Sequence, residues 1–479
     1  MNDSQGAFDL SVDELHDYSA AVNHFMKEWL AREPEDPILE SISGQELAAG
    51  LETGLPRQGM EFDAVIQEFR DWIARYSRAN GNPRYFAYVC ASADPIGALA
   101  DALASVMNQN VTAWRSAPAA ATVERLVLSW LDELVGFNAG GHGVLTGGGS
   151  PANFNALAMA LQRAAENGRD DRRQFVLYLS ADTHLSLHKA GRILGIPVDN
   201  IRGIELDEAR RMRSDELRKA ITADRNAGLH PLMVVGSAGT ANCGAIDPLD
   251  DIASIADEEQ LWFHIDGAYG APAAMTESHG WLRNAFAKAD SLSLDPHKWL
   301  YAPLDIGCSL FRDADLARRT FSETAAYTTV EQTDPLEAHA FFDYGMELSR
   351  RFRALKLWMQ LKFRGSNAIA ARIQEDIRLR EHLDAAIAAS DDFEAMGSDL
   401  SISCFRYRPN GMDEDTCNAF NRELLDRLLA QGRFLLSPTT LDGRFCLRIC
   451  IVNFRTRRED LDELLKTLRE IASTLKKDS

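Results

Sequence analysis

Short apolar runs alternate with longer stretches of helical periodicity through the middle of the chain. Apolar runs separated by helical segments indicate a mostly parallel sheet covered by helices on both faces. The expected strands are Phe175–Leu179, Leu232–Val235, Trp262–Ile265, Ser291–Leu294 and Cys308–Phe311. The pattern therefore predicts a large α/β domain over residues 81–365.

The first 80 residues show a different pattern. Apolar residues recur at helical spacing from Asp9 towards Trp29 and again from Phe62 to Tyr76, with Pro and Gly between the two segments. Two helices alone cannot bury a core of their own. We therefore expect residues 1–80 to form a helical arm that packs on something else, such as another subunit.

The last part of the chain mixes both periodicities. Helical spacing over 367–390 is followed by apolar strands at 402–407 and 445–452 and by a closing helical segment from Arg458 to Lys476. This order predicts a small α+β domain over residues 366–479.

Composition narrows the class of protein. The chain has 479 residues and a formal net charge of −20, which argues against non-specific binding to nucleic acid or to anionic membranes. It contains no apolar run long enough for a transmembrane helix, and its first residues show no secretory signal. The seven cysteines are scattered and form no C-x-x-C pair. These features are typical of a cytoplasmic enzyme with reduced thiols and no metal site.

Two charged residues stand just past expected strands. Lys298 follows the run Ser291–Leu294 in the sequence Asp-Pro-His-Lys-Trp, and Asp266 ends the run that begins at Trp262. A lysine after a strand is most often a surface charge. On neighbouring strand ends, however, a Lys and an Asp are placed to bind the two ends of pyridoxal phosphate (PLP), the Lys as a Schiff base and the Asp at the pyridinium N–H.

A glycine run opens the first long helix of the α/β domain. In Thr146-Gly-Gly-Gly-Ser-Pro, Ser150 is a natural N-cap and Pro151 suits the first helical turn. Glycines allow close approach of an anion, and the helix N-terminus offers free N–H groups. The run matches neither the dinucleotide nor the Walker pattern, so a phosphate loop and a merely capped helix both remain open.

Two further polar segments follow strands. His184 comes after Phe175–Leu179, where an imidazole could lie over a planar ring, and it is nearer to the strand end than His188. A capping or core histidine is the alternative. Thr240 follows Leu232–Val235 and falls in the same region of the sheet.

Glycine loop, His, Thr-Gly turn, Asp and Lys thus follow one another in chain order, each after a strand. The chain resembles the group II PLP-dependent decarboxylases of the aromatic-L-amino-acid, histidine and glutamate decarboxylase type. The matching stretches cover roughly residues 10–475 and include Asn82–Tyr88, the Gly-Gly-Ser loop, His184, Thr240, His264–Tyr269, Pro296–Trp299 and Arg350–Trp358.

The resemblance implies a fold type I PLP enzyme, in which a homodimer carries active sites at its interface. It makes Lys298 the Schiff-base lysine, Asp266 the partner of the pyridine nitrogen and His184 the residue stacked on the ring. It places the remaining cofactor contacts at Gly149, Ser150, Thr240, Ala268, Asp295 and His297. Position 295 is often Asn in the aromatic decarboxylases, so the contact of Asp295 with the phosphate is less secure.

Counting forward from Lys298, Tyr327 falls where the family has a mobile-loop tyrosine. In the family, loss of CO₂ produces a quinonoid intermediate, and this tyrosine then protonates its Cα. Relatives with Phe there tend to form aldehydes. The resemblance therefore implies decarboxylation of an L-amino acid, first of all an aromatic one, to its amine. Without the resemblance, the sequence alone would indicate only an exposed tyrosine in a loop at position 327.

The expected substrate wall departs from the aromatic decarboxylases. Beyond Tyr88, the expected wall positions are the small residues Val89, Cys90 and Ala91, and two positions that are often Ile and Phe are Asn110 and Thr112. Arg448 matches an arginine that meets a substrate carboxylate in some relatives, although a salt bridge at a sheet edge would explain it as well. Such a lining would also admit a larger or more polar side chain.

Three alternatives remain open from the sequence. The chain could decarboxylate a non-aromatic amino acid. It could be another fold type I enzyme, namely an aldehyde synthase, a carbon–carbon lyase or an aminotransferase. It could also be a non-catalytic protein of the same fold, which the intact pair of Asp266 and Lys298 opposes.

Overall fold

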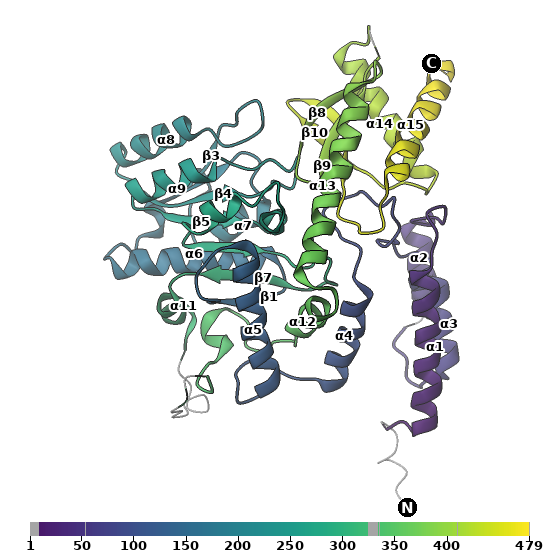
Figure 1. Cartoon of the computed structure of the whole chain (residues 1–479), viewed down its shortest axis with the longest axis horizontal. Coiled ribbons are helices and arrows are strands. Elements are labelled where there is room, and N and C mark those ends of the chain that lie inside the picture. Colours follow the sequence, from purple (N-terminus) through teal and green to yellow (C-terminus); the bar gives the residue numbers. More distant parts are fainter. Residues whose placement is uncertain (1–8, 53, 324–333, 335, 410, 479) are drawn as a thin grey trace, which may run out of the picture. The chain divides into compact units, whose positions relative to one another are not determined.

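The computed structural model describes residues 9–52, 54–323, 334, 336–409 and 411–478 (Figure 1). The chain forms two compact units. Unit 1 comprises Met1–Tyr85, Arg422–Leu436 and Arg455–Ser479, and unit 2 comprises Phe86–Asn421 and Ser437–Phe454. These boundaries differ from the three domains expected above, and that division stays a prediction.

Unit 2 contains a seven-stranded sheet with the strand order β1-β7-β6-β5-β4-β2-β3. Strands β6, β5, β4, β2 and β3 run parallel, and β7 is antiparallel to both of its neighbours. The expected mostly parallel sheet is confirmed. Its strands are β1 (Gly143–Thr146), β2 (Phe175–Ser180), β3 (Ile201–Ile204), β4 (His230–Ser237), β5 (Trp262–Asp266), β6 (Ser291–Leu294) and β7 (Gly307–Phe311).

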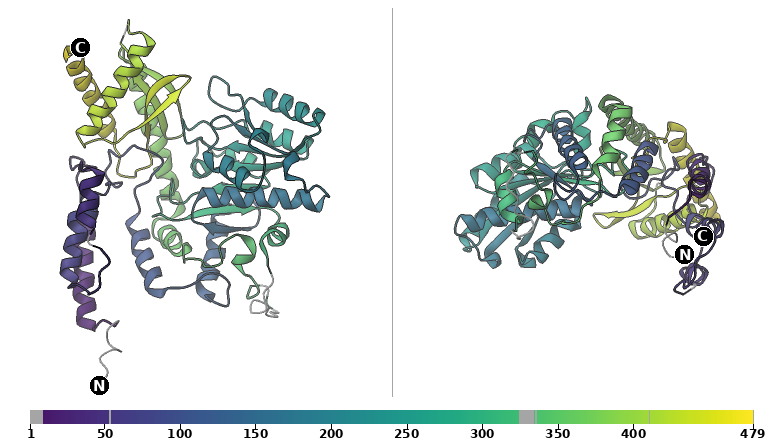
Figure 2. Two further views of the ribbon diagram at one scale, coloured as in Figure 1. Left: turned by 180° about the vertical axis from the view of Figure 1, so that it is seen from behind. Right: turned by 90° about the horizontal axis from the view of Figure 1, so that it is seen from below.

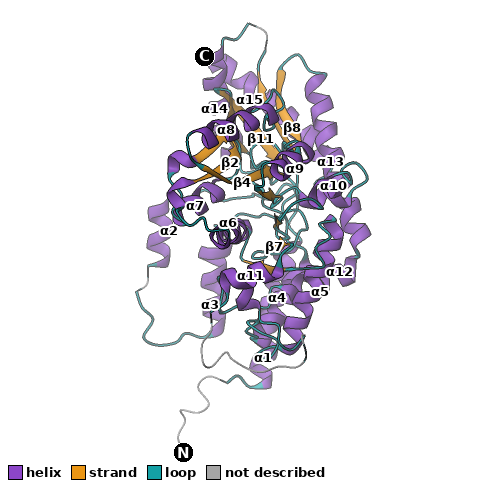
Figure 3. Ribbon diagram, turned by 90° about the vertical axis from the view of Figure 1, so that its left-hand side faces the viewer, coloured by secondary structure: helices purple, strands orange, loops and turns teal. Residues whose placement is uncertain are grey.

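Helices cover the strands of this sheet, as the colouring by secondary structure makes visible (Figure 3). Helix α6 packs along β1, β4, β5, β6 and β7, while α8 and α9 pack on β3, β4 and β5. All residues of β2, β5, β6 and β7 are buried, which explains their continuous apolar character. The helices of this part are α4 (Pro95–Met107), α5 (Pro118–Val135), α6 (Gly149–Glu166), η2 (Arg172–Gln174), α7 (Leu185–Ile193), η3 (Val198–Asn200), α8 (Ser214–Asn226), α9 (Leu249–Glu258), η4 (Ala271–Met275), α10 (Leu282–Phe286), α11 (Ala314–Phe321), η5 (Phe341–Tyr344), α12 (Ala354–Arg364) and α13 (Ser366–Ala388).

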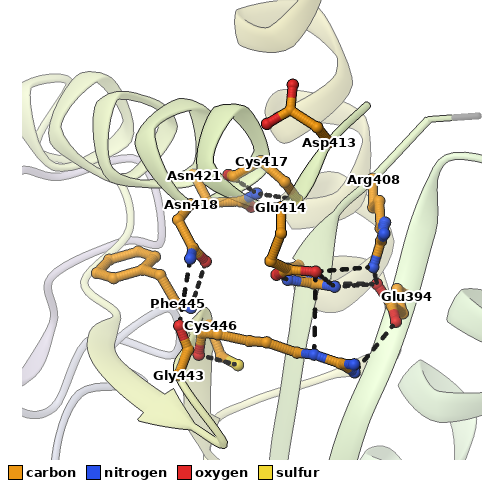
Figure 4. Close-up of polar contacts among 12 residues, drawn as sticks. Glu394, Arg408, Asp413, Glu414, Cys417, Asn418, Asn421, Gly443, Phe445 and Cys446 are labelled. Atoms are coloured by element: carbon orange, nitrogen blue, oxygen red, sulfur yellow. Dashed lines mark hydrogen bonds and ion pairs between the residues drawn. The ribbon is translucent and has the colours of Figure 1, made fainter. Parts of the chain in front are cut away.

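A second, antiparallel sheet has the order β10-β11-β9-β8. Its strands are β8 (Phe393–Asp399), β9 (Ile402–Tyr407), β10 (Ser437–Leu441) and β11 (Arg444–Cys450). Ion pairs join this sheet to the start of α14 (Glu414–Ala430), as Figure 4 shows. Glu394 on β8 accepts from the buried Arg406 at 2.7 Å, and Arg408 bridges Glu394 and Glu414 at 3.2 and 3.3 Å. The network anchors the helix because a fully buried guanidinium needs carboxylate partners.

Unit 1 contains α1 (Val12–Leu30), α2 (Gly44–Leu51), α3 (Phe62–Glu68), the π-helix η1 (Phe69–Ala74) and α15 (Arg458–Asp478). Helix α1 begins with a capping box between Ser11 and Glu14 and lies beside α3 (Figure 2). The rings of Tyr18 and Phe62 stack at 4.2 Å. None of the residues of α1 is buried. Within the described residues, none of the helices combines the length and the apolar character that crossing a membrane requires.

Candidate active site

Asp266 and Lys298 lie at the same edge of the large sheet. Strand β5 ends at Asp266, and its parallel neighbour β6 ends at Leu294, four residues before Lys298. Asp266 pairs in register with Ser293 of β6. Because the carboxyl ends of parallel strands meet at one edge, the fold brings the two residues together, as the sequence predicted.

The Asp266 carboxylate is buried and held by three donors. Asn153 Nδ2 donates to Oδ2 at 3.1 Å, while the Ala268 N–H and the Ser293 hydroxyl donate to Oδ1 at 3.2 and 3.3 Å. The three donors satisfy acceptor sites on both oxygens of the buried carboxylate. Oδ2 keeps room for one more donor.

A chain of hydrogen bonds fixes Asn153 behind Asp266. His264 is fully buried, and its Nε2 lies 2.9 Å from Asn153 Oδ1. Ser291 Oγ lies 2.8 Å from His264 Nδ1 and accepts from Trp262 Nε1 at 2.8 Å. Burial lowers the pKa of His264 to about 4, so the ring is neutral. Its Nε2–H then donates to Asn153, which leaves the amide N–H₂ free to donate to Asp266.

Lys298 faces another carboxylate in this structure. Its Nζ lies 2.9 Å from Asp295 Oδ2, and 22% of its side chain is exposed. Burial alone would lower the Lys298 pKa, but the charge and hydrogen bond of Asp295, with a smaller contribution from Asp266, raise it above the usual value. The amine is therefore held as an ammonium ion.

His297 lies on the other side of Asp295. Its Nδ1 lies 2.6 Å from the carbonyl oxygen of Ile306, and its Nε2 lies 3.8 Å from Asp295 Oδ2. Burial lowers the pKa of His297, so the imidazole is neutral near pH 7. With Nδ1 donating to the carbonyl, Nε2 is left as an acceptor.

The glycine run forms the turn between β1 and α6. Helix α6 begins at Gly149 with Gly148 as its N-cap, so the expectation that Ser150 is the N-cap is wrong. Gly148 has a φ of 153°, which a side chain rarely tolerates, and this lets the backbone turn into the helix two residues earlier. Thr146 closes the turn by donating from Oγ1 to the Gly148 carbonyl at 2.8 Å.

The same turn lies against the lysine segment. A Cβ placed on Gly149 would come within 3.0 Å of Ala268 Cβ and of Asp295 Oδ2, and one on Gly148 would lie 3.5 Å from His297 Cε1. The first N–H groups of α6 therefore face a space bounded by Ala268, Asp295 and His297, which suits an anion.

His184 is the N-cap of α7. Its Nδ1 accepts from the Ser186 N–H at 3.3 Å and lies 2.8 Å from Ser186 Oγ. Asn153 Nδ2 also donates to Ser186 Oγ, at 3.0 Å, so His184 is linked through two side chains to Asp266. The capping alternative is therefore realised, and the exposed ring remains near the Asp266 cluster.

Thr240 is buried in the turn after β4. Its N–H donates to the Ala245 carbonyl at 2.9 Å, and two residues earlier the Ala238 N–H donates to the Asp266 carbonyl at 2.9 Å. Backbone pairing thus places the Thr240 turn next to Asp266.

Arg448 ties the expected substrate wall to this turn. Its guanidinium donates to the carbonyls of Asn242, Ala241 and Tyr88 at 2.9, 2.6 and 3.2 Å. These contacts are hydrogen bonds to backbone carbonyls and not the salt bridge at a sheet edge that the sequence left open. Tyr88 has a φ of 59° and donates its N–H to Ser437 Oγ at 2.7 Å, while Val89 and Ala91 are half-buried against the core.

Asn110 and Thr112 are held elsewhere. Asn110 Oδ1 accepts from the Arg350 N–H at 2.8 Å, and the Thr112 carbonyl accepts from the Phe342 N–H at 3.3 Å. In the described part of the chain, no contact joins these two residues to Lys298. Tyr327 lies outside the described residues.

Comparisons with known proteins show the family of this chain. Residues 45–408 match the family described as "Pyridoxal-dependent decarboxylase conserved domain". The chain is 33% identical over 438 residues to an aromatic-L-amino-acid decarboxylase of Bacillus atrophaeus, covering 91% of each protein. It is 29% identical to a phenylacetaldehyde synthase of Petunia hybrida, covering 89% of this chain and 88% of that protein. A crystal structure of Oryza sativa TDC with PLP and tryptamine superposes with a TM-score of 0.92 at 26% identity, covering 97% of this chain and 99% of that chain.

The chain therefore belongs to the pyridoxal-dependent decarboxylase family. It has the fold of the fold type I PLP enzymes, and it is a PLP-dependent carboxy-lyase.

The residues present fit this cofactor. Gly149 leaves no room for a side chain where the helix N-terminus meets Ala268 and Asp295, as a phosphate cradle requires. Asp266 keeps acceptor capacity for a ring N–H, and Lys298 is partly exposed between the two. The helix N-terminus, Lys298 and Asp266 together thus suit a molecule with a phosphate at one end and a basic ring nitrogen at the other.

Sequence reasoning missed two supporting residues. Asn153 sits on the buried face of α6, where a polar amide signals a buried partner. Asp376 is fully buried on α13 and accepts from Trp299 Nε1 at 3.0 Å and from Tyr301 Oη at 2.6 Å. It holds the residues that flank Lys298. An Asp among the apolar positions of a long helix was the available signal.

Proposed function

We propose that this carboxy-lyase removes the α-carboxylate of an aromatic L-amino acid and releases the amine and CO₂. The observation that carries the proposal is the placement of Asp266 and Lys298 on adjoining strand ends beside the glycine turn. The relatives named for decarboxylation of aromatic amino acids, tryptophan and tyrosine support the substrate class.

Lys298 and Asp266 carry the central roles in this proposal. Bound PLP supplies an electron sink for the electron pair that the departing CO₂ leaves behind. Lys298 Nζ is the attachment point, and its amine must lose a proton before it can act as a nucleophile. Asp266 would accept the hydrogen bond of the protonated ring nitrogen, because three donors hold its carboxylate in place and Oδ2 can accept one more.

The remaining cofactor contacts orient the group. Gly149 and Ser150 offer the free N–H groups of α6 to the phosphate, and His297 lies beside them. His184 covers the ring from its cap position, and Thr240 approaches from the neighbouring turn. Ala268 and Asp295 bound the phosphate end of the site.

Tyr327 is proposed to return the proton to Cα, which makes the amine the product. Several relatives are aldehyde synthases, so aldehyde formation is the second candidate function. The tyrosine at this position favours the amine.

Tyr88, Val89 and Ala91 are proposed to line the substrate side, with Arg448 behind them. Arg448 uses three of its five N–H donors on backbone carbonyls, so it can still meet a carboxylate. The small residues at 89 and 91 leave space for a bulky aromatic side chain.

We further propose a cytoplasmic homodimer that completes each site across its interface. Asn110 and Thr112 are expected substrate contacts, yet each is bound to the segment 342–350. They would serve the partner's site instead. Exposed apolar residues support burial in an assembly, with Val12 on α1 84% exposed and Val106 on α4 86% exposed. None of the seven cysteines, which all lie within the described residues, forms a disulfide, in keeping with a reducing compartment.

A CO₂-release screen tests the function. The purified protein, loaded with PLP, is offered each amino acid, including tryptophan, tyrosine, DOPA and 5-hydroxytryptophan, and CO₂, amine and aldehyde are measured separately. An aromatic amino acid should give equal CO₂ and amine. The Lys298→Ala variant should release no CO₂ and should retain no cofactor after borohydride reduction. Turnover restricted to non-aromatic amino acids would refute the substrate class, and wild-type turnover by Lys298→Ala would refute the site.

A further inference from the structure

Asp295 is a buried carboxylate, and within the described part of the chain only one of its two side-chain oxygens has a partner. Its side chain is 3% exposed, and Oδ2 lies 2.9 Å from Lys298 Nζ. Oδ1 is fully buried and has no hydrogen-bond partner among the residues that the structure describes. A buried acceptor without a donor is costly, so it calls for an explanation in the chemistry of the site.

Both oxygens lie against the turn that is proposed to bind the phosphate. A Cβ on Gly307 would come within 2.7 Å of Oδ1, and one on Gly149 would come within 3.0 Å of Oδ2 and 3.5 Å of Oδ1. The carboxylate therefore borders the N-terminus of α6. A phosphate dianion bound there would meet a like charge at short range in a site with little water.

Protonation of the Asp295 carboxylate removes this repulsion between Asp295 and the phosphate. A protonated Asp295 has an O–H that can donate to a phosphate oxygen, whereas the ionised form can only accept. An amide at this position would donate without needing a proton. This chain needs a source for that proton, and the Lys298 ammonium ion lies in hydrogen-bond contact.

We propose that Asp295 exchanges one proton with Lys298 as the cofactor loads. In the cofactor-free protein Asp295 is the anionic partner of the Lys298 ammonium ion. When the phosphate enters the glycine turn, an N–H bond of Lys298 breaks and an O–H bond forms on Asp295. The proton count of the pair is unchanged, no electron is transferred, and Lys298 gains the lone pair it needs. The inference rests on the proposed roles of Lys298 and of the glycine turn.

The other groups around the pair compete little for this proton. Burial lowers the pKa of His297, so its imidazole binds a proton weakly. Burial raises the pKa of Cys450 to about 11 and that of Cys308 higher still, so both thiols stay protonated. Asp266 accepts from three donors of its own. Two further carboxylates border the turn at Gly147 and are paired with arginines: Asp305 with Arg351 and Arg353 at 3.2 Å, and Glu347 with Arg353 at 2.6 Å.

Infrared difference spectroscopy reads the state of Asp295 directly. The spectrum of the loaded protein minus that of the cofactor-free protein is recorded at about pH 8, above the pKa of about 6 of the buried Asp247 and Asp376. The wild type should gain the C=O band of a protonated carboxylic acid, which shifts in D₂O. If the wild type gains no such band, the proposal is wrong, and this result requires no variant.

Two matched variants assign the band. Asp295→Asn keeps the shape of the side chain but cannot carry the proton, so the band should disappear. Asp305→Asn removes a neighbouring carboxylate beside the turn, and the band should remain. Loss of the band in Asp305→Asn but not in Asp295→Asn would overturn the assignment.

The pH dependence of cofactor capture tests the exchange itself. Asp295→Asn must release the Lys298 proton to water, whereas the wild type passes it to Asp295. The ratio of the variant's capture rate to that of the wild type should therefore rise about tenfold per pH unit until the free amine predominates. A ratio that stays constant, or falls, with pH contradicts the proposal. Lys298→Ala separates the two hypotheses: covalent cofactor in that variant refutes the proposed site, whatever Asp295→Asn does.

Discussion

Removing the Asp376 carboxylate should loosen the segment that carries Lys298. Trp299 and Tyr301 both donate to this buried carboxylate, and Trp299 also stacks on Tyr269 at 5.0 Å. In Asp376→Ala both donors lose their acceptor. A buried donor without an acceptor costs about 1–3 kcal/mol, so the variant should lose about 2–6 kcal/mol of unfolding free energy.

The loss converts into a measurable temperature shift. An unfolding entropy of about 2.1 cal/mol/K per residue gives on the order of 1 kcal/mol/K for 479 residues. The thermal midpoint of Asp376→Ala should fall by about 2–6 °C. Asp376→Asn keeps an acceptor oxygen for the aromatic donors and loses the charge pair with Arg372, whose side chain is 19% exposed, so a smaller fall than in Asp376→Ala is expected.

Thermal unfolding followed by circular dichroism at fixed PLP concentration provides the assay. Asp250→Ala is a suitable control, because it removes an exposed carboxylate paired with Lys288 and should cost less than about 1 °C. The dissociation constant for PLP should rise in Asp376→Ala and stay unchanged in the control. If Asp376→Ala lowers the midpoint no more than Asp250→Ala does, the anchoring argument fails.

Three further outcomes are expected. Tyr327→Phe should make aldehyde the main product, as measured by separating amine from aldehyde, and unchanged amine output would refute the loop assignment. Glu124→Gln leaves the buried Arg350, 2.6 Å away, without its counter-charge and should cost about 3–5 kcal/mol of unfolding free energy, measured as a lower thermal midpoint. Adding Arg350→Met should recover part of this loss, and no recovery would contradict the pairing. Burial raises the pKa of Asp376 to about 6, so the folded protein binds this proton more tightly than the unfolded chain does. The midpoint of the wild type should therefore fall relative to that of Asp376→Asn as the pH rises from about 4 to about 6, and parallel curves would refute this sign.

The large sheet was predictable where its strands are buried on both faces. The five strands expected from apolar runs all occur, and their observed bounds differ by one or two residues at most. Two strands were missed. Strand β3 lies at the edge and contains Arg202 and Gly203, and β1 is the short Gly143–Thr146. Short or half-exposed strands carry little apolar signal.

The helix start at the glycine run shows a different limit. Ser150 is a good N-cap by type, yet α6 begins at Gly149. The position of the turn depends on Gly307 and Asp295, which pack against it from distant parts of the chain. Local preference for a cap is worth about 1 kcal/mol, which such packing can outweigh.

The sequence by itself determined the strands, the order of the functional groups along the chain and their position just past strand ends, because apolar periodicity and turn residues are local properties. The tertiary structure decided which groups meet. Asn153 reaches Asp266 across 113 residues, and Asp376 reaches Trp299 across 77. It also decided that Lys298 faces Asp295 and that Asn110 and Thr112 are bound to another segment. Such contacts arise only when buried polar groups must find partners in the packed fold.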